Sequence, residues 1–259
     1  MTVRLVLEGV SKTYVDRRGQ ALVALEDVSL TVAAEEFVAV LGPSGCGKST
    51  LLQLVAGLLA PSAGRIYFEG ARRDGRPLTA MVFQEFALFP WRTVQANVEF
   101  GLEELGVPAE ERARRARALI ELTGLAGFER RYPHQLSGGM RQRVGIARAL
   151  AVNPLVLLMD EPFSALDAQT RELLQEELLT LWERTRTTVL YVTHNIQEAV
   201  FLADRVVVLS RRPGRVLADV AVTLPRPRPA ALAARPAFAE LVERIWGLIR
   251  DEAREALTG

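Results

Sequence analysis

Residues 42–50 match the pattern G-x-x-x-x-G-K-[ST] of a phosphate-binding loop. Residues 37–41 before the loop are apolar and are predicted to form a buried strand, and residues 51–56 after it begin a helix. Glycines let backbone N–H groups turn toward phosphates, and a helix N-terminus favours negative charge. Lys48 is expected to reach the β- and γ-phosphates, and the Ser49 hydroxyl to ligate Mg²⁺. The motif predicts a nucleoside triphosphate site made of Gly42, Pro43, Ser44, Gly45, Cys46, Gly47, Lys48, Ser49 and Thr50.

Two adjacent carboxylates end a second apolar run. Asp160 and Glu161 follow residues 155–159, which are predicted to form a buried parallel strand. Such a strand delivers its last residues to the carboxyl edge of the sheet, where ligands bind in open α/β folds. We expect Asp160 to hold Mg²⁺ through water and Glu161 to act as general base toward the attacking water. The alternative is a strand followed by an acidic turn, and the phosphate-binding loop upstream favours the catalytic interpretation.

A second helix start also has the features of an anion site. Ser137 is the predicted N-cap of a helix over residues 138–151, and Gly138 and Gly139 leave backbone N–H groups accessible. An ordinary cap with a glycine turn is an equally good interpretation of this segment alone. One copy of the chain has no obvious way to fold this site onto its own phosphate-binding loop. Two copies arranged head to tail are expected to lend these residues to each other's γ-phosphate.

Together these motifs make the chain resemble the ATP-binding subunit of an ABC transporter, over residues 5–210 in the family's order. The resemblance implies that Tyr14 stacks on adenine and that Gln84 senses Mg²⁺ and the γ-phosphate. It implies that Asp167 belongs to the family's D-loop and that His194 contacts the γ-phosphate. Tyr14 could instead be an edge-strand aromatic, Gln84 a surface residue and His194 a helix N-terminal residue. Met140 replaces the family's usual Gln, beyond the Ser-Gly-Gly contacts, and is interpreted as a subclass marker.

Alternating apolar strands and amphipathic helices predict an α/β fold with a largely parallel sheet. The resemblance implies a P-loop NTPase core of the RecA-like type, with an antiparallel β subdomain and an inserted α-helical subdomain. We expect residues 1–93 and 153–210 to form the nucleotide-binding core and residues 94–152 the helical subdomain with the signature motif. Residues 211–259 form a C-terminal extension. In it, the proline-rich residues 225–229 are predicted to be an extended tether to a last helix.

Composition excludes several classes of protein. The 32 Lys and Arg nearly balance the 31 Asp and Glu, so no global field favours nucleic acid. The single cysteine, Cys46, excludes an internal disulfide; a helix N-terminus can lower a thiol pKa, so alkylation of Cys46 is expected to block nucleotide binding. No signal peptide and no apolar run of membrane-spanning length is found. We therefore expect a peripheral protein on the cytoplasmic face of the cell inner membrane.

An aromatic loop follows Gln84 directly. Residues 85–91, Glu-Phe-Ala-Leu-Phe-Pro-Trp, have no periodicity and are costly to leave exposed. In the resembled family this region receives a permease helix, and aromatic anchors suit helix capture. The alternative is a loop folded back onto its own core. The amino-acid sequence of residues 88–102 and of the Pro-Arg segment at residues 225–229 resembles that of the nitrate, sulfonate and taurine importer group.

The expected function is therefore an Mg²⁺-dependent ATPase that drives a small-solute importer. We expect a homodimer, a permease bound through residues 84–91, an extracytoplasmic solute-binding protein and no nucleic acid. One alternative is a non-transport ABC-type ATPase that acts on nucleic acid or the ribosome. Another is a P-loop small-molecule kinase, which has no use for Ser137 or for a Glu161 aimed at water. A third is a regulatory ATP-binding module without turnover, against which Glu161 and His194 argue.

Overall fold

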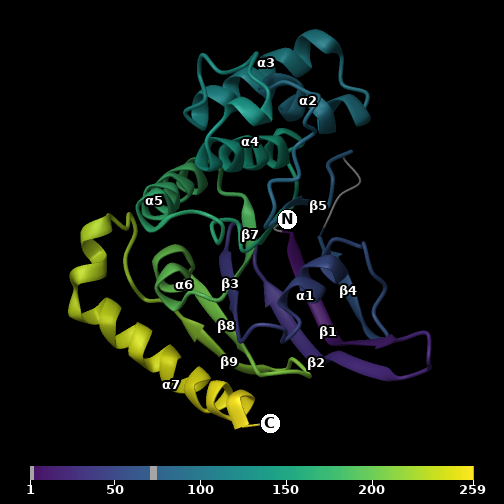
Figure 1. Ribbon diagram of the computed structural model, residues 1–259, viewed down its shortest axis with the longest axis vertical. Coiled ribbons are helices and arrows are strands. Elements are labelled where there is room, and N and C mark those ends of the chain that lie inside the picture. Colours follow the sequence, from purple (N-terminus) through teal and green to yellow (C-terminus); the bar gives the residue numbers. More distant parts are fainter. Residues whose placement is uncertain (1–2, 71–74, 259) are drawn as a thin grey trace. The chain divides into compact units, whose positions relative to one another are not determined.

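The computed structural model describes residues 3–70 and 75–258, with side chains up to residue 250 (Figure 1). The chain divides into two compact units, residues 1–72 together with 188–259, and residues 73–187. Each unit is described by itself. The domain boundaries expected from the sequence stay a prediction. In the part of the chain that is described, no helix combines the length and the apolar character needed to cross a membrane.

The first unit begins with a three-stranded antiparallel sheet in the order β2-β1-β4. Its strands are β1 (Arg4–Val15), β2 (Ala21–Val32) and β4 (Ala63–Glu69). Leu5, Leu7 and Val10 of β1 are buried, and β1 pairs antiparallel with β2. Residues 16–20 connect the two strands, and Asp16 Oδ1 accepts hydrogen bonds there from the backbone N–H groups of Arg18 and Gln20 at 2.8 Å.

The first unit also holds four strands in the order β7-β3-β8-β9. They are β3 (Phe37–Leu41), β7 (Thr188–Thr193), β8 (Arg205–Leu209) and β9 (Val216–Ala221). β3 lies parallel to both β7 and β8, and every residue of β3 and β7 is buried. A strand buried on both faces reads as a continuous apolar run, which is why these strands were predictable from the sequence. The helices of this unit include α1 (Lys48–Val55) and α6 (Ile196–Leu202).

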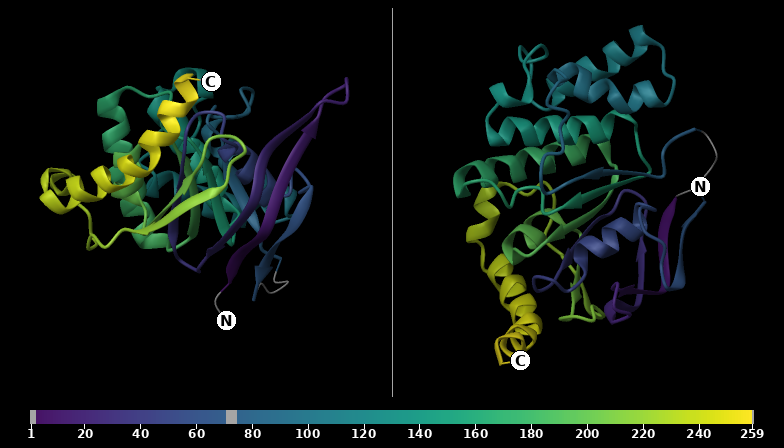
Figure 2. Two further views of the ribbon diagram at one scale, coloured as in Figure 1. Left: turned by 90° about the horizontal axis from the view of Figure 1, so that it is seen from below. Right: turned by 45° about the vertical axis from the view of Figure 1, so that its right-hand side comes forward.

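The C-terminal segment packs on the first unit. After η2 (Ala230–Ala234), the helix α7 (Pro236–Thr258) contacts α6, β8 and β9, and Ile245 and Ile249 are buried (Figure 2). Residues 225–229 are not helical and lead to the last helix, as predicted, and they also pack against the first unit. Arg228 is only 4% exposed, and its guanidinium donates hydrogen bonds to the carbonyls of Val200, Phe201 and Ala203 at 3.2, 3.0 and 2.7 Å. The segment thus satisfies carbonyls at the C-terminal end of α6.

The second unit combines a strand pair with a helical group (Figure 1). β5 (Thr79–Val82) and β6 (Val156–Asp160) are parallel neighbours. The helices are α2 (Val94–Glu104), α3 (Ala109–Leu122), α4 (Gly138–Ala151) and α5 (Ala168–Thr185), with the short η1 (Pro133–Gln135) before α4. α2, α3 and α4 share an apolar core that includes Val98, Ile120 and Val144.

Most of the elements expected from the sequence are present. The helix predicted over residues 138–151 corresponds to α4, and the predicted last helix corresponds to α7. Neither α6 nor β9 is predicted from the sequence. α6 has only seven residues, too few for a helical period to be evident, and β9 is a half-exposed strand with Asp219 in its middle.

Candidate active site

The phosphate-binding loop runs from the end of β3 to the start of α1, as predicted. Gly45 and Gly47 have φ values of 75° and 108°, which side chains rarely tolerate. A Cβ added at Gly47 would lie 2.7 Å from Leu25 Cδ2, and one added at Gly42 would lie 2.9 Å from Cys46 Sγ. The loop can therefore close this tightly only with glycine at positions 42 and 47.

Lys48 holds its amine against the loop. Its side chain is 5% exposed, and Nζ donates hydrogen bonds to the carbonyls of Gly42 at 2.8 Å and Pro43 at 2.9 Å. Gly47 is the N-cap of α1 and brings no side chain, and the first turn of α1 has no acidic residue. The positive end of the helix is therefore not neutralised by a nearby carboxylate of its own first turn. Together these features suit an anion at the loop.

Two further predicted residues lie beside the loop in the first unit. The Tyr14 hydroxyl is 3.3 Å from Thr50 Oγ1, at the C-terminal side of the loop. His194 follows Thr193, and Thr193 pairs with Leu41, the last residue before the loop. Because β3 and β7 are parallel, His194 and the loop leave the sheet at the same edge. The structure thus brings Tyr14 and His194 to the phosphate-binding loop.

A buried hydrogen-bond network fixes the backbone around His194. Thr193 Oγ1 donates to the carboxylate of Glu198, and the backbone N–H of Asn195 donates to Thr193 Oγ1 at 3.0 Å. Asn195 caps α6, where its Oδ1 accepts from the N–H of Glu198 at 3.2 Å. Glu198 was not singled out from the sequence, although Asn195 followed three residues later by Glu198 has the spacing of a capping box.

Two neighbouring parallel strands of the second unit carry predicted site residues at their ends. Gln84 lies just after β5, Asp160 is the last residue of β6, and Glu161 follows it. Val82, the last residue of β5, pairs with Met159 of β6, so these side chains leave the sheet at one edge. Gln84 Nε2 donates to Ser164 Oγ at 3.2 Å, and Ser164 Oγ donates to the carbonyl of Glu161 at 2.9 Å. Glu161 has a φ of 42°, an uncommon conformation for a residue with a side chain. The predicted Gln84 and Glu161 are thus linked through Ser164.

The Ser-Gly-Gly segment starts α4 as predicted. Ser137 is the N-cap, and its Oγ accepts from the N–H of Met140 at 3.3 Å. A Cβ added at Gly138 would lie 3.0 Å from Leu166 Cδ2, so the segment packs beside the residues before Asp167. Glycine at this position lets the two segments approach closely.

Asp167 is the N-cap of α5, and its Oδ1 accepts from the N–H of Thr170 at 2.9 Å. The hydrogen bonds from Thr170 hold the pKa of the Asp167 carboxyl below its usual value of 3.8. Asp167 is therefore ionised at the positive end of α5 at neutral pH.

The aromatic loop after Gln84 is partly packed and partly exposed. Phe89 lies 4.5 Å from Phe100 between ring centroids, and the guanidinium groups of Arg92 and Arg148 lie 5.8 and 5.7 Å from the Phe89 ring. Trp91 is 72% exposed. Burial lowers the pKa of Arg148. The loop thus folds back onto its own unit at Phe89, yet leaves Trp91 exposed.

Asn97 holds this loop on α2 and was not recognised from the sequence as a structural residue. It is fully buried, and its Nδ2 donates to the carbonyls of Phe89, Arg92 and Thr93 at 3.2, 3.0 and 3.0 Å. Its Oδ1 accepts from the N–H of Phe89 at 2.9 Å. This amide contacts four main-chain groups, and the Phe89 and Thr93 carbonyls among them also accept backbone hydrogen bonds. It thereby ties the non-periodic segment to α2.

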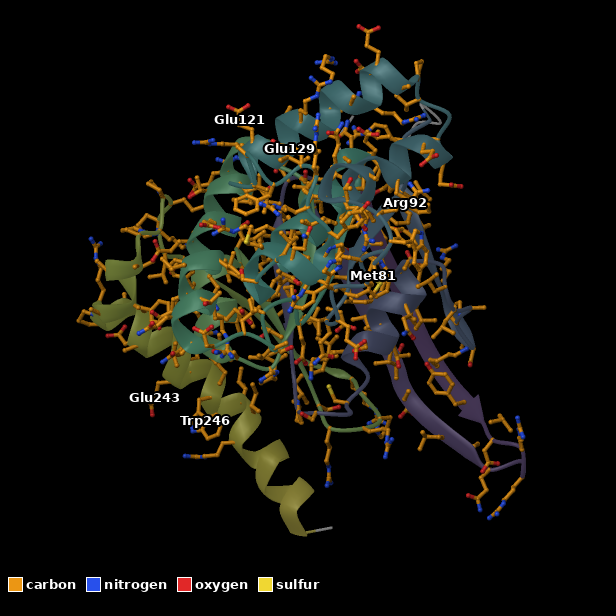
Figure 3. All side chains as sticks on the ribbon, turned by 45° about the horizontal axis from the view of Figure 1, so that its top comes forward. Met81, Arg92, Glu121, Glu129, Glu243 and Trp246 are labelled. Carbon is orange, nitrogen blue, oxygen red and sulfur yellow. The ribbon has the colours of Figure 1, made fainter. Side chains whose placement is uncertain are left out.

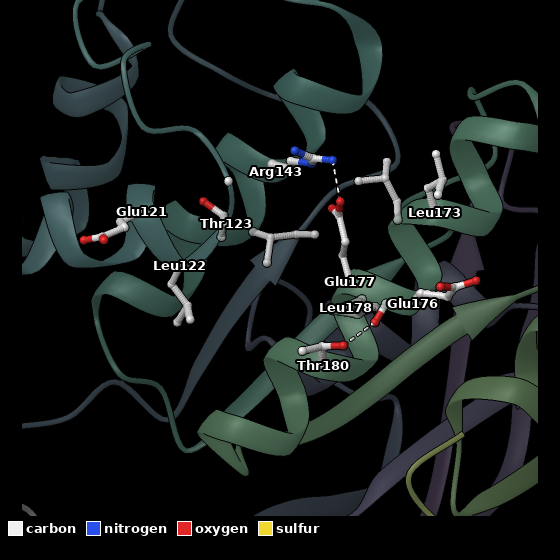
Figure 4. A pocket seen from close by; sticks show the side chains of 12 residues that line it. Glu121, Leu122, Thr123, Arg143, Leu173, Glu176, Glu177, Leu178 and Thr180 are labelled. Atoms are coloured by element: carbon white, nitrogen blue, oxygen red, sulfur yellow. Dashed lines mark hydrogen bonds and ion pairs between the residues drawn. The ribbon is translucent and has the colours of Figure 1, made fainter. Parts of the chain in front are cut away.

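Two pockets among the described residues are lined by no residue of the phosphate-binding loop. One of about 470 Å³ in the second unit lies among α3, α4 and α5, where Arg143 Nη2 is 2.6 Å from Glu177 Oε1 (Figure 4). None of the predicted site residues lines it. The other, of about 390 Å³ in the first unit, is lined by His194, Asn195, Val242 and Trp246. Trp246 is half-exposed on α7 (Figure 3).

The comparison with known proteins shows the family. The family model described as ABC transporter matches residues 25–164. An uncharacterized ABC transporter ATP-binding protein of Methanocaldococcus jannaschii is 47% identical over 258 residues, covering 99% of this chain and 95% of that protein. The nitrate import ATP-binding protein NrtD of a Synechocystis species is 43% identical over 260 residues, 98% and 97% of the two chains. The taurine import ATP-binding protein TauB of Yersinia pestis is 53% identical over 209 residues, 80% and 81%.

Solved structures agree with this assignment. A dimeric, post-hydrolysis state of an ATP-binding cassette bound to ADP and Pi matches with a TM-score of 0.73 at 35% identity, covering 85% of this chain and 99% of that one. A component of an ABC transporter complex from Clostridium perfringens matches with a TM-score of 0.73 at 30% identity, covering 94% of each chain. The predicted α/β fold of the P-loop NTPase type is therefore confirmed. The chain belongs to the ABC transporter family and is an ATPase of the ABC type.

Proposed function

We propose that this ATPase energises the import of a small solute through a partner membrane permease, on the cytoplasmic face of the cell inner membrane. The observation that carries the proposal is the aromatic loop. Trp91 in it is exposed, and the neighbouring backbone is held by hydrogen bonds from Asn97. The similarity to nitrate and taurine import proteins supports an importer. It also favours a nitrate-, sulfonate- or taurine-like compound as the solute.

In the proposed hydrolysis, the loop of residues 42–50 binds the phosphates and Lys48 contacts the β- and γ-phosphates. Lys48 would exchange the two loop carbonyls that its amine now contacts for phosphate oxygens. Tyr14, beside Thr50, provides a face for adenine. His194 contacts the γ-phosphate from the end of β7, and Glu161 accepts a proton from the attacking water.

The residues proposed for Mg²⁺ are Ser49, Gln84 and Asp160. Among residues 3–70 and 75–258, no group of three or more His, Cys, Asp and Glu side chains forms a metal site by itself. This donor set suits Mg²⁺, which commonly takes one or two protein oxygens, several waters and the phosphates of a nucleotide. The ion, when bound with ATP, neutralises charge on the β- and γ-phosphates.

We further propose that two copies of the chain act as a dimer around two ATP molecules. In each copy, Ser137, Gly138 and Gly139 would contact the γ-phosphate held by the other, and Asp167 would lie at the boundary between the copies. The N-terminus of α4 suits an anion because Gly138 and Gly139 add no side chain beside the backbone N–H groups; Gly139 itself is buried in the single chain. The similar cassette bound to ADP and Pi was solved as a dimer, which supports this proposal.

The permease contact is assigned to residues 84–91. Gln84 bonds to Ser164, and Ser164 bonds to the carbonyl of the proposed general base Glu161. The aromatic residues follow Gln84 directly in the chain. A change at the γ-phosphate that moves Gln84 would therefore move the docking loop, which provides a physical route from nucleotide state to permease.

The test is a tagged pull-down from detergent-solubilised native membranes, with mass-spectrometric identification of the retained proteins. The wild-type chain should retain a multi-helix permease, and the permease should point to the solute. Retention of ribosomal or nucleic-acid-binding proteins without a permease would contradict the transport proposal and favour a non-transport ABC-type ATPase.

A further inference from the structure

Gln142 is a fully buried amide in the middle of α4. Its side chain has no exposed surface, and neither Oε1 nor Nε2 has a hydrogen-bond partner among the described residues. Leaving a buried amide unpaired is unfavourable, whereas an apolar side chain of similar size would carry no such cost. Stability of the conformation seen here therefore does not explain why residue 142 is a glutamine.

The face of α4 that carries Gln142 is the face toward the segment after Gln84. Gly138 and Gly145 lie four residues before and three residues after Gln142, so the three share one side of the helix. A Cβ at Gly145 would lie 3.8 Å from the carbonyl oxygen of Phe86, and one at Gly138 would lie 4.0 Å from Phe86 Cζ. Gln142 thus lies between two positions that both adjoin Phe86.

The facing segment has an unfavourable backbone at the next residue. Ala87 has a φ of 46°, in the left-handed region that favours glycine. Arg148 Nη1 donates to the Ala87 carbonyl at 2.7 Å, and the Arg141 guanidinium lies 5.0 Å from the Phe86 ring. Two arginines of α4 therefore hold the segment in this conformation, one on each side of Gln142. The unpaired amide and the residue with the left-handed backbone thus belong to two segments that pack against each other.

We propose that Gln142 is a positioning residue for ATP hydrolysis. In a second arrangement of residues 86–87, Ala87 leaves the left-handed region and the Gln142 amide pairs with the main chain at Phe86. This movement would relieve both the left-handed backbone of Ala87 and the unpaired amide of Gln142. The free energy gained would be balanced by loss of the hydrogen bond from Arg148 to the Ala87 carbonyl, so both arrangements can be populated. The movement would be transmitted to Gln84 through the chain, so the inference rests on the proposed role of Gln84.

The test compares Gln142→Leu with wild type in ATP turnover and in thermal unfolding of the full chain. Turnover should fall about 2- to 30-fold, with KM for ATP unchanged, because the second arrangement loses its hydrogen bond. The Tm should stay the same or rise, since a buried unpaired amide has been removed. Amide hydrogen exchange at residues 86–88 should change on addition of ATP in wild type and change less in the variant.

Gln175→Leu is the matched control. Gln175 is a buried glutamine on α5 that does have an interaction partner, so the same substitution there should lower the Tm. If Gln142→Leu lowers both Tm and turnover, Gln142 is a structural residue and the inference is wrong. The inference is also wrong if turnover is unchanged. Gln84→Ala tests the proposed role of Gln84 separately. Normal turnover in that variant would contradict the proposed function at Gln84, whatever the result for Gln142→Leu.

Discussion

Replacing Trp91 by Ala tests the docking loop. Trp91 is 72% exposed, and a tryptophan can bury up to about 250 Å². If a permease helix covers the exposed part, roughly 180 Å² leaves water, worth about 4.5 kcal/mol at about 25 cal/mol per Å². Ordering of side chains reduces this gain, so we expect a loss of about 2–4 kcal/mol, within the range of aromatic anchors at interfaces. That corresponds to a roughly 30- to 1,000-fold higher Kd for the permease.

The assay is binding of the purified, tagged chain to membrane vesicles prepared from native cells that lack the chain, titrated to obtain Kd. Trp246→Ala is the matched control, because Trp246 is also exposed (46%) but lies on α7 in the other unit (Figure 3). Trp246→Ala should bind like wild type. Equal affinity of wild type and Trp91→Ala, or equal losses in the two variants, would refute the assignment of the docking loop.

Three further predictions concern single residues. Asn97→Ala should destabilise the chain by about 2–4 kcal/mol, because the Phe89 N–H and the Arg92 carbonyl lose their partner. Chemical denaturation measures this, and a loss below about 1 kcal/mol would show that the loop does not depend on Asn97. Asp167 has a lowered pKa in the folded state, so its contribution to stability is present above its ordinary pKa of 3.8 and is lost as pH falls through the lowered value. Asp167→Asn should therefore have a lower Tm than wild type at neutral pH and the same Tm in acid. A Tm difference that stays constant across pH would contradict this. Cys46 is 1% exposed, so a thiol reagent should modify the folded protein slowly and the unfolded protein fast, and ATP should slow the reaction further; fast labelling in the presence of ATP would contradict the prediction.

The strands and the phosphate-binding loop could be predicted because their signals are local. β3 and β7 are buried on both faces and so appear in the sequence as continuous apolar runs. Gly47 is required by its φ of 108° and, like Gly42, by close neighbours; both could be predicted because they belong to one short sequence motif. The caps at Ser137 and Asp167 follow from one side chain and one backbone N–H three residues later.

The remaining features depend on contacts between segments distant in the sequence. Arg228 was interpreted as part of a tether because its partners are carbonyls of residues 200–203, which no local pattern reveals. The link from Gln84 through Ser164 to Glu161 joins residues 80 positions apart. Asn97 and Gln142 are polar residues in helices, and only the fold shows that one is fully paired and the other unpaired.

The measurement that tests the central claim most directly is steady-state ATP hydrolysis by the wild-type chain and by Glu161→Gln, with ATP binding measured on the same preparations. The wild type should hydrolyse ATP only with Mg²⁺. Glu161→Gln should bind ATP like wild type but turn it over about 10²- to 10⁴-fold more slowly, because it cannot accept the proton of the attacking water. Near-normal turnover in Glu161→Gln would contradict the proposed chemistry of the site.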